Sequence, residues 1–115
     1  MRRGDIYWVD FKLVRGSEAS KRRPAVGVSN DAASRAAERR GTGLMTVVPI
    51  TSNTDRVLPF QTLLKAAECR LPRDSKAQAE QVRMVAVERL ADRIGAVPAA
   101  SLRRLDDALH LHLAP

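Results

Sequence analysis

Short β-forming runs separated by turn residues set the strongest limit on how this chain can fold. Six runs are rich in β-branched, aliphatic or aromatic residues, and they occupy residues 6–11, 24–29, 44–51, 60–64, 81–87 and 93–97. The first run is apolar at successive positions, which predicts a strand buried on both faces in a tightly curled sheet. Pro49 has no amide hydrogen and therefore fits an edge or a bulge better than a central ladder position. Many short strands are typical of a small β-barrel.

Two segments carry helical signals instead. Asn30 and Asp31 can cap a short helix over residues 32–38, and Gly41 and Gly43 follow it as stop signals. Near the C-terminus, leucines recur at steps of three, four and four residues, on one side of a helix that begins near residues 98–101; these are Leu102, Leu105, Leu109 and Leu113. Such a stripe packs on a core or on a second copy of the chain. We expect one domain over residues 1–115, mainly β (α+β), with a short inserted helix and a C-terminal helix.

Positive charge is concentrated in the first third of the chain. The sequence has 20 Lys and Arg against 13 Asp and Glu, a net charge of +7, and residues 1–43 hold ten basic and five acidic side chains. A one-sided basic surface attracts polyanions, so nucleic acid is the first class of partner to consider. No apolar run approaches the roughly 20 residues that span a bilayer, and no signal-peptide pattern opens the sequence. We therefore expect a cytoplasmic protein without a membrane partner.

Cysteine and histidine offer little chemistry here. Cys69 is the only cysteine, so it has no intrachain disulfide partner, and its default role is a small buried hydrophobe. His110 and His112 are the only histidines, and a spacing of two residues points them to different sides of a helix. They make a poor metal pair. The sequence predicts neither a metal site nor a cofactor.

The basic segment of residues 16–24, GSEASKRRP, is a candidate phosphate-binding loop. Pro24 fixes its own φ and biases Arg23 toward an extended backbone, so the Arg23 guanidinium leaves the loop in few directions. Loops from one rim of a curled sheet can converge, which would bring Arg23, Thr51 and Glu18 around one phosphate. Arg23 would stabilise the charge that develops as a ribose 2′-hydroxyl attacks, and Thr51 or Ser52 would orient an oxygen. The alternative is an ordinary exposed charged turn with a threonine chosen for β-propensity.

Ordered motifs along the chain resemble the MazF/PemK family of toxins. They are RGDIYWVDF (residues 3–11), GSE (16–18), RPAV (23–26), PITSN (49–53), DS (74–75), EQVR (80–83) and RIG (93–95). Each motif is weak alone, but their order and spacing cover almost the whole chain. The resemblance implies an SH3-like β-barrel with a C-terminal helix. It also implies a homodimeric, metal-independent endoribonuclease that cuts single-stranded RNA and pairs with an acidic, partly disordered antitoxin.

Site residues follow from the resemblance position by position. The catalytic arginine and threonine of the family fall on Arg23 and Thr51, and Glu18 matches an acidic residue of the active-site loop in some members. Cleavage would leave a 2′,3′-cyclic phosphate and a 5′-hydroxyl. Arginine is a poor general base because its pKa is above 12, so Glu18 and an unidentified group stay open for that role. RNA contacts are expected from neighbouring and downstream polar residues, namely Lys21, Arg22, Ser52, Asn53, Lys76 and Gln81.

Two other functions are compatible with such a chain. A toxin of the related CcdB type would bind DNA gyrase through an apolar C-terminal tail and leave RNA intact. A non-catalytic RNA-binding module would need aromatic stacking surfaces. The aromatic residues are Tyr7, Trp8, Phe11 and Phe60, and three of them share one strand where core packing is the default. This composition favours the nuclease.

Overall fold

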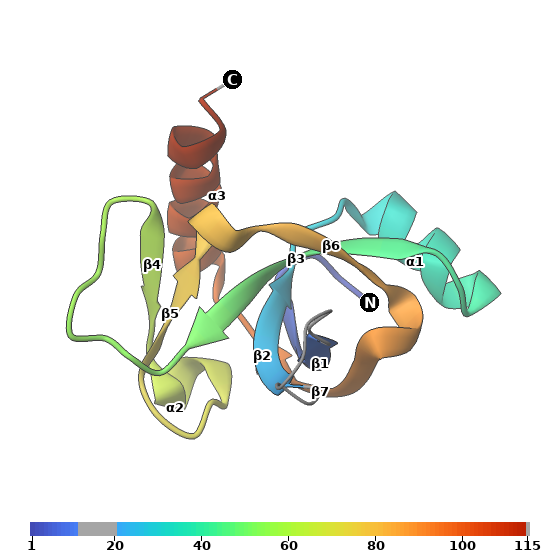
Figure 1. Cartoon of the computed structure of the whole chain (residues 1–115), viewed down its shortest axis with the longest axis horizontal. Helices are drawn as coiled ribbons and strands as arrows, with labels where there is room; N and C mark the ends of the chain where they lie inside the picture. The colour runs from blue at the N-terminus through green and yellow to red at the C-terminus, as the bar shows by residue number, and fades with distance from the viewer. Residues whose placement is uncertain (12–20, 115) are drawn as a thin grey trace.

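The computed structural model describes residues 1–11 and 21–114, and antiparallel strands dominate it (Figure 1). Seven strands form the sheet: β1 (Asp5–Phe11), β2 (Lys21–Gly27), β3 (Leu44–Thr51), β4 (Gln61–Leu64), β5 (Ser75–Gln78), β6 (Arg83–Ala86) and β7 (Leu90–Ala96). Three α-helices and two 3₁₀ turns accompany them: α1 (Asp31–Arg40), α2 (Ala66–Cys69), α3 (Ala99–Leu113), η1 (Ala79–Gln81) and η2 (Val87–Arg89). The mainly β fold with an inserted and a C-terminal helix is confirmed.

The sheet is open rather than closed into the small β-barrel that the many short strands suggested. Its strand order is β4-β5-β3-β2-β1-β7, and β6 pairs with β3 off this path. The strand β3 pairs with two other strands in turn, because its first half pairs with β6 and its last two residues pair with β5. Pro49 falls between these two pairings, where a residue without an amide hydrogen costs no ladder bond on that side.

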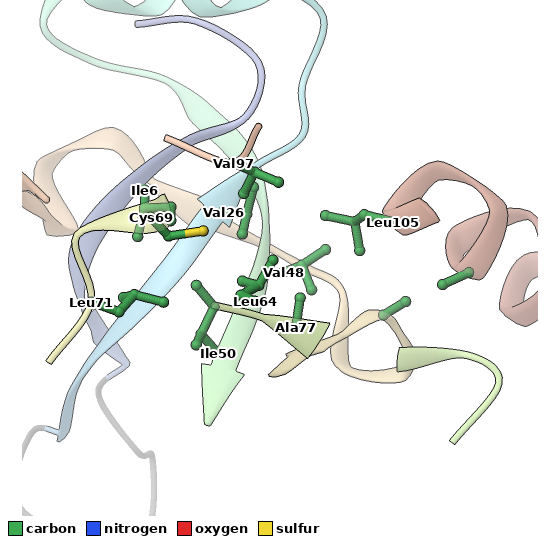
Figure 2. Packing of buried hydrophobic residues seen from close by; sticks show 12 residues of the cluster. Ile6, Val26, Val48, Ile50, Leu64, Cys69, Leu71, Ala77, Val97 and Leu105 are labelled. Atoms are coloured by element: carbon green, nitrogen blue, oxygen red, sulfur yellow. The ribbon is translucent and has the colours of Figure 1, made fainter. Parts of the chain in front are cut away.

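The central strands bury side chains on both faces, as the apolar run of residues 6–11 predicted for the first strand. On one face, the α3-side core contains residues of β1, β2 and β3 together with Leu64, Cys69 and Leu105 (Figure 2). On the other face, the α1-side core combines the alternate residues of the same strands with Ala37 of α1 and Val85 of β6; the strand residues are Val9, Phe11, Ala25, Met45 and Val47. Figure 1 shows the corresponding layers, with α3 beside β4 and β5 and α1 at the opposite end of the molecule.

Helix boundaries follow ordinary capping chemistry. Asn30 is the N-cap of α1, because its side chain accepts a hydrogen bond from the Ala33 amide at 2.8 Å, and Gly41 ends the helix in a left-handed conformation with φ 67°.

In α3, Leu105 is fully buried, Leu102 and Leu109 pack against the core, and Leu113 is 61% exposed. The leucine stripe therefore leaves the core before the helix ends. Along the described residues, no helix combines the length and apolar character that crossing a bilayer requires.

Several element boundaries differ from the expectation. Residues 81–87 divide into the end of η1, the short strand β6 and the start of η2 rather than one strand. The sequence analysis also missed α2 and β5, whose residues AAEC and SKAQ have neither helical periodicity long enough to detect nor β-branched side chains. These two elements matter, because the segment between them forms one wall of the candidate site.

Candidate active site

A pocket of about 350 Å³ opens where the central strands meet the segment between α2 and β5. The strands contribute its first wall, which consists of Trp8, Arg23, Pro24, Ile50, Thr51 and Ser52. The α2–β5 segment contributes the second wall, which consists of Leu71, Pro72, Arg73 and Ser75. The pocket is therefore built from four parts of the chain that are far apart in sequence.

Strand register explains how Arg23 and Thr51 come together. Ala25 of β2 pairs with Pro49 of β3, and continuing this antiparallel register by two residues sets Arg23 opposite Thr51. Arg23 is half-buried at the position in β2 that pairs with Val9 of β1. Two of the residues that the sequence analysis expected around one phosphate thus line one pocket.

The turn after β3 orients the Thr51 side chain. The Asn53 amide donates a hydrogen bond to Thr51 Oγ1 at 3.3 Å, and the Asp55 amide donates to Asn53 Oδ1 at 3.2 Å. Because Thr51 Oγ1 accepts from the turn, its own hydroxyl hydrogen is free to point toward an acceptor in the pocket. Ser52 also lines the pocket, whereas Asn53 is exposed beside it and uses its side-chain oxygen to hold the turn.

Hydrogen bonds also hold the second wall in place. Ser75 Oγ donates to the Arg73 carbonyl at 2.9 Å, and Asp74 Oδ1 accepts from the Ala66 amide at 2.8 Å. The Asp74 carboxylate is therefore occupied at the start of α2. Arg73 is exposed and lines the pocket. The sequence analysis did not select Arg73, although it stands next to the Asp74–Ser75 motif.

Among the remaining predicted site residues, those whose side chains the structure describes do not line this pocket. Glu18 is outside the described residues, as is the side chain of Lys21, whose backbone belongs to β2. Arg22 is exposed and pairs with Asp10 in the β1–β2 register, and Gln81 is exposed in η1; neither lines this pocket. Lys76 is only 8% exposed, and its ammonium donates to the Arg56 carbonyl. The Lys76 side chain thus holds the loop before β4.

Trp8 differs from the expectation that all three aromatic residues of the first strand are core residues. Ile6, two positions earlier, is fully buried, and Phe11 is 6% exposed in the α1-side core. Trp8 is half-buried and lines the pocket opposite Pro24, its partner in the β1–β2 register. This placement follows from the β1–β2 register, in which Trp8 pairs with Pro24, and the sequence alone does not give that register.

Groups with shifted pKa values lie outside the pocket. Burial and the neighbouring Asp5 carboxylate raise the pKa of Tyr7 to about 12, so its hydroxyl stays protonated at neutral pH. Burial also raises the pKa of Cys69, which is 1% exposed; it is a small buried hydrophobe, as expected. Within residues 1–11 and 21–114, no three His, Cys, Asp or Glu side chains gather closely enough to hold a metal ion.

Comparisons with known proteins identify the family. The family model described as "PemK-like, MazF-like toxin of type II toxin-antitoxin system" matches residues 2–113. The chain is 58% identical over 113 residues to Endoribonuclease MazF9 of Mycobacterium tuberculosis, covering 98% of this chain and 96% of that protein. It is 30% identical over 115 residues to Endoribonuclease EndoA of Bacillus subtilis, covering 99% and 95%.

A solved structure agrees with this assignment. The MazE–MazF crystal structure (Form-II) from Deinococcus radiodurans matches with a TM-score of 0.76 and 27% identity, covering 99% of this chain and 96% of that chain. Sequence motifs, the family model and the fold thus agree over nearly the full length. The chain belongs to the PemK-like, MazF-like family of toxins from type II toxin–antitoxin systems.

Proposed function

We propose that this chain is an endoribonuclease toxin that cleaves single-stranded RNA in the pocket holding Arg23 and Thr51, without a metal ion. The observation that carries the proposal is that these two residues, from the neighbouring strands β2 and β3, line one pocket. The names of relatives along the full chain, MazF9 and EndoA among them, support the same activity. RNA is in the cytoplasm, where we expect the toxin to act as a single domain of residues 1–115.

The chemistry of the two side chains fits transesterification of a phosphodiester. The ribose 2′-oxygen forms a bond to phosphorus while the bond from phosphorus to the 5′-oxygen breaks, which leaves a 2′,3′-cyclic phosphate and a 5′-hydroxyl. Arg23 presents a planar set of donors to the phosphate oxygens and stabilises their growing negative charge. Thr51 donates its free hydroxyl hydrogen to a second phosphate oxygen, because its oxygen already accepts from Asn53.

Two protons must also move. The 2′-hydroxyl loses one to a base, and the leaving 5′-oxygen gains one. Arginine is a poor general base, so Arg23 is unsuited to the first transfer and serves as the electrostatic partner of the phosphate. Glu18 is our candidate for the base, on the family resemblance. Around this centre, Lys21, Arg22, Ser52 and Asn53 would contact neighbouring nucleotides.

We propose two protein partners. The titles of solved relatives describe MazF with MazE and an endoribonuclease with its cognate antitoxin, so a cognate antitoxin is expected here. An acidic segment of it would cover the basic pocket and compete with RNA. The second partner is another copy of the chain, docked through the exposed apolar side chains beside α3, which are Val57, Leu63 and Leu111. Arg104 and Asp107 line the same groove, and antiparallel packing of two α3 helices would bring each to its opposite charge.

Cleavage of a mixed-sequence single-stranded RNA in EDTA tests the proposal at one stated salt concentration. Discrete fragments with 5′-hydroxyl ends are expected from the wild type, and Arg23→Ala and Thr51→Ala should lose them. Arg103→Ala removes one exposed positive charge from α3 and is the matched control. Intact RNA with the wild type would turn attention to DNA gyrase. Cleavage that survives Arg23→Ala would support the nuclease function but show that the active site does not depend on Arg23.

A further inference from the structure

We propose that Trp8 and Arg73 form a nucleotide subsite beside the cleavage site, in which one RNA base stacks on the Trp8 indole and Arg73 binds a phosphate next to it. The inference rests on the proposed function only in taking RNA as the ligand. It concerns two residues to which the sequence analysis gave no role in the site and which lie on opposite walls of the pocket.

The first observation is the incomplete burial of Trp8. The α2 helix and the residues after it cover Ile6 on the same face of β1, because Cys69 and Leu71 pack in the α3-side core with it (Figure 2). This cover ends before Trp8, which faces the pocket instead. Tryptophan usually buries its large apolar surface, so an indole that lines an open pocket is a ready surface for another flat apolar group.

The second observation is the apolar character of the walls next to this indole. Pro24 stands opposite Trp8 in the strand register, and Ile50, Leu71 and Pro72 complete the apolar lining. A planar base seated between this strand wall and the opposite wall of Leu71 and Pro72 would lose its contact with water on both faces. Stacking on an aromatic side chain is the usual way in which proteins bind single-stranded nucleic acid, and it tolerates any base.

The third observation is the placement of positive charge. Arg23 lines the pocket from the strand wall and Arg73 from the α2–β5 wall, so each wall carries one arginine. The two phosphates that flank one nucleoside of the strand would meet these two arginines in turn. Ser75 holds the Arg73 carbonyl and thereby fixes the backbone from which this side chain extends. A volume of about 350 Å³ is near the lower end for ligand pockets, which suits one nucleotide.

The sole tryptophan of the chain is Trp8, so its fluorescence reports on this pocket alone. The probes are a short 2′-deoxy oligonucleotide, which lacks the attacking hydroxyl and stays intact, and an abasic oligonucleotide of equal length and charge. We expect the base-bearing probe to quench Trp8 and to bind at least about fivefold more tightly than the abasic one. Equal affinity of the two probes, with unchanged fluorescence, would overturn the subsite.

Substitutions separate stacking from packing, with binding followed by the anisotropy of labelled probes. Trp8→Phe keeps an aromatic face and should retain most of the preference for the base-bearing probe, whereas Trp8→Leu fills space without a π-face and should lose it. Phe60→Leu, in a half-buried aromatic residue outside the pocket, should change nothing. If Trp8→Leu is folded by circular dichroism and still prefers the base-bearing probe, the stacking role is wrong. If it is unfolded, the wild-type fluorescence titration decides.

Arg73 has its own readout. Arg73→Gln should weaken both probes and lower the slope of log affinity against log salt by about 0.7, the value for one phosphate contact in a single strand. Arg103→Gln removes the same charge from α3 and should leave that slope unchanged. An unchanged slope for Arg73→Gln would remove Arg73 from the subsite.

The RNA cleavage assay keeps the two proposals apart. A wild type that stacks the base-bearing probe without cutting RNA would support the subsite and contradict the proposed function. A wild type that cuts RNA but binds both probes equally would do the reverse. Where both hold, Trp8→Leu should raise KM for RNA more than it lowers kcat, because stacking contributes to substrate binding before the transition state.

Discussion

Replacing Lys76 with Met should destabilise the fold and leave RNA binding almost unchanged. Lys76 was expected to contact RNA, but its side chain is 8% exposed and its ammonium donates to the Arg56 carbonyl. Met keeps the length and apolar stem of the side chain and removes the donor. Hydrogen bonds from charged groups contribute about 1.5–3 kcal/mol, and water can partly replace the lost bond because Arg56 is exposed. We therefore expect a loss of about 1–2 kcal/mol in the free energy of unfolding.

For a domain of this size, that loss lowers the Tm by about 4–8 °C. Thermal and urea unfolding measure it, and titration of a 2′-deoxy oligonucleotide at several salt concentrations measures the phosphate contacts. Lys65→Met is the matched control, because Lys65 is exposed and its ammonium stands 4.0 Å from Asp74, a surface pair worth at most about 1 kcal/mol. An unchanged Tm for Lys76→Met together with a salt slope lower by about 0.7 would show that Lys76 binds RNA and would refute its anchoring role.

Three other expectations follow from the site and the core. Thr51→Val removes only the hydroxyl and should lower kcat for RNA about 10²–10³-fold, whereas Thr51→Ser keeps the hydroxyl and should retain most of the rate. Equal rates for the two variants would show that the hydroxyl has no part in the mechanism. Gly95→Ala should cost about 1–3 kcal/mol or more in urea unfolding, since the added Cβ would lie 2.3 Å from the Cys69 carbonyl oxygen, whereas at Gly27 it would meet its nearest atom at an ordinary 3.7 Å. Burial alone would raise the pKa of Asp5, but hydrogen bonds from Arg2 and Arg93 outweigh it and the pKa is lowered. The folded state thus binds fewer protons, so the stability from Asp5 is present above the unfolded pKa of 3.8 and is lost as pH falls below it. Asp5→Asn should flatten the fall in urea midpoint below about pH 4, and an unaltered fall would contradict this assignment.

The sequence predicted those elements that carry a strong local signal. The strand ending at Thr51 is rich in apolar and β-branched residues, and α1 has its cap at Asn30, so both could be located without the structure. The segment with α2 and β5 lacks such signals, because four-residue elements are too short for a period and their conformation depends on tertiary contacts. The open form of the sheet could not be predicted either, since the sequence does not show which strands pair along the edge of β3.

Site residues show the same division. Arg23 and Thr51 could be selected because the family motifs contain them and because their chemistry suits a phosphate. Trp8 and Arg73 could not be selected. Trp8 lines the pocket because the α2–β5 segment stops covering β1 before it, and Arg73 lies on that segment, whose elements the sequence did not predict. The burial of Lys76 is the opposite case, in which a charged residue that reads as a surface contact is used inside the fold.

The position of β3 between the two cores also bears on how the molecule unfolds. Met45 and Val47 belong to the α1-side core, and Val48 and Ile50 belong to the α3-side core. Neither core can melt without disrupting the strand that completes the other, so local opening of one should spread to both. Amide hydrogens at the middle of β3 should therefore exchange only with global unfolding. Thr51 is the last residue of this strand and pairs with Lys76 of β5, so the proposed catalytic hydroxyl stands at the end of the element that both cores hold in place.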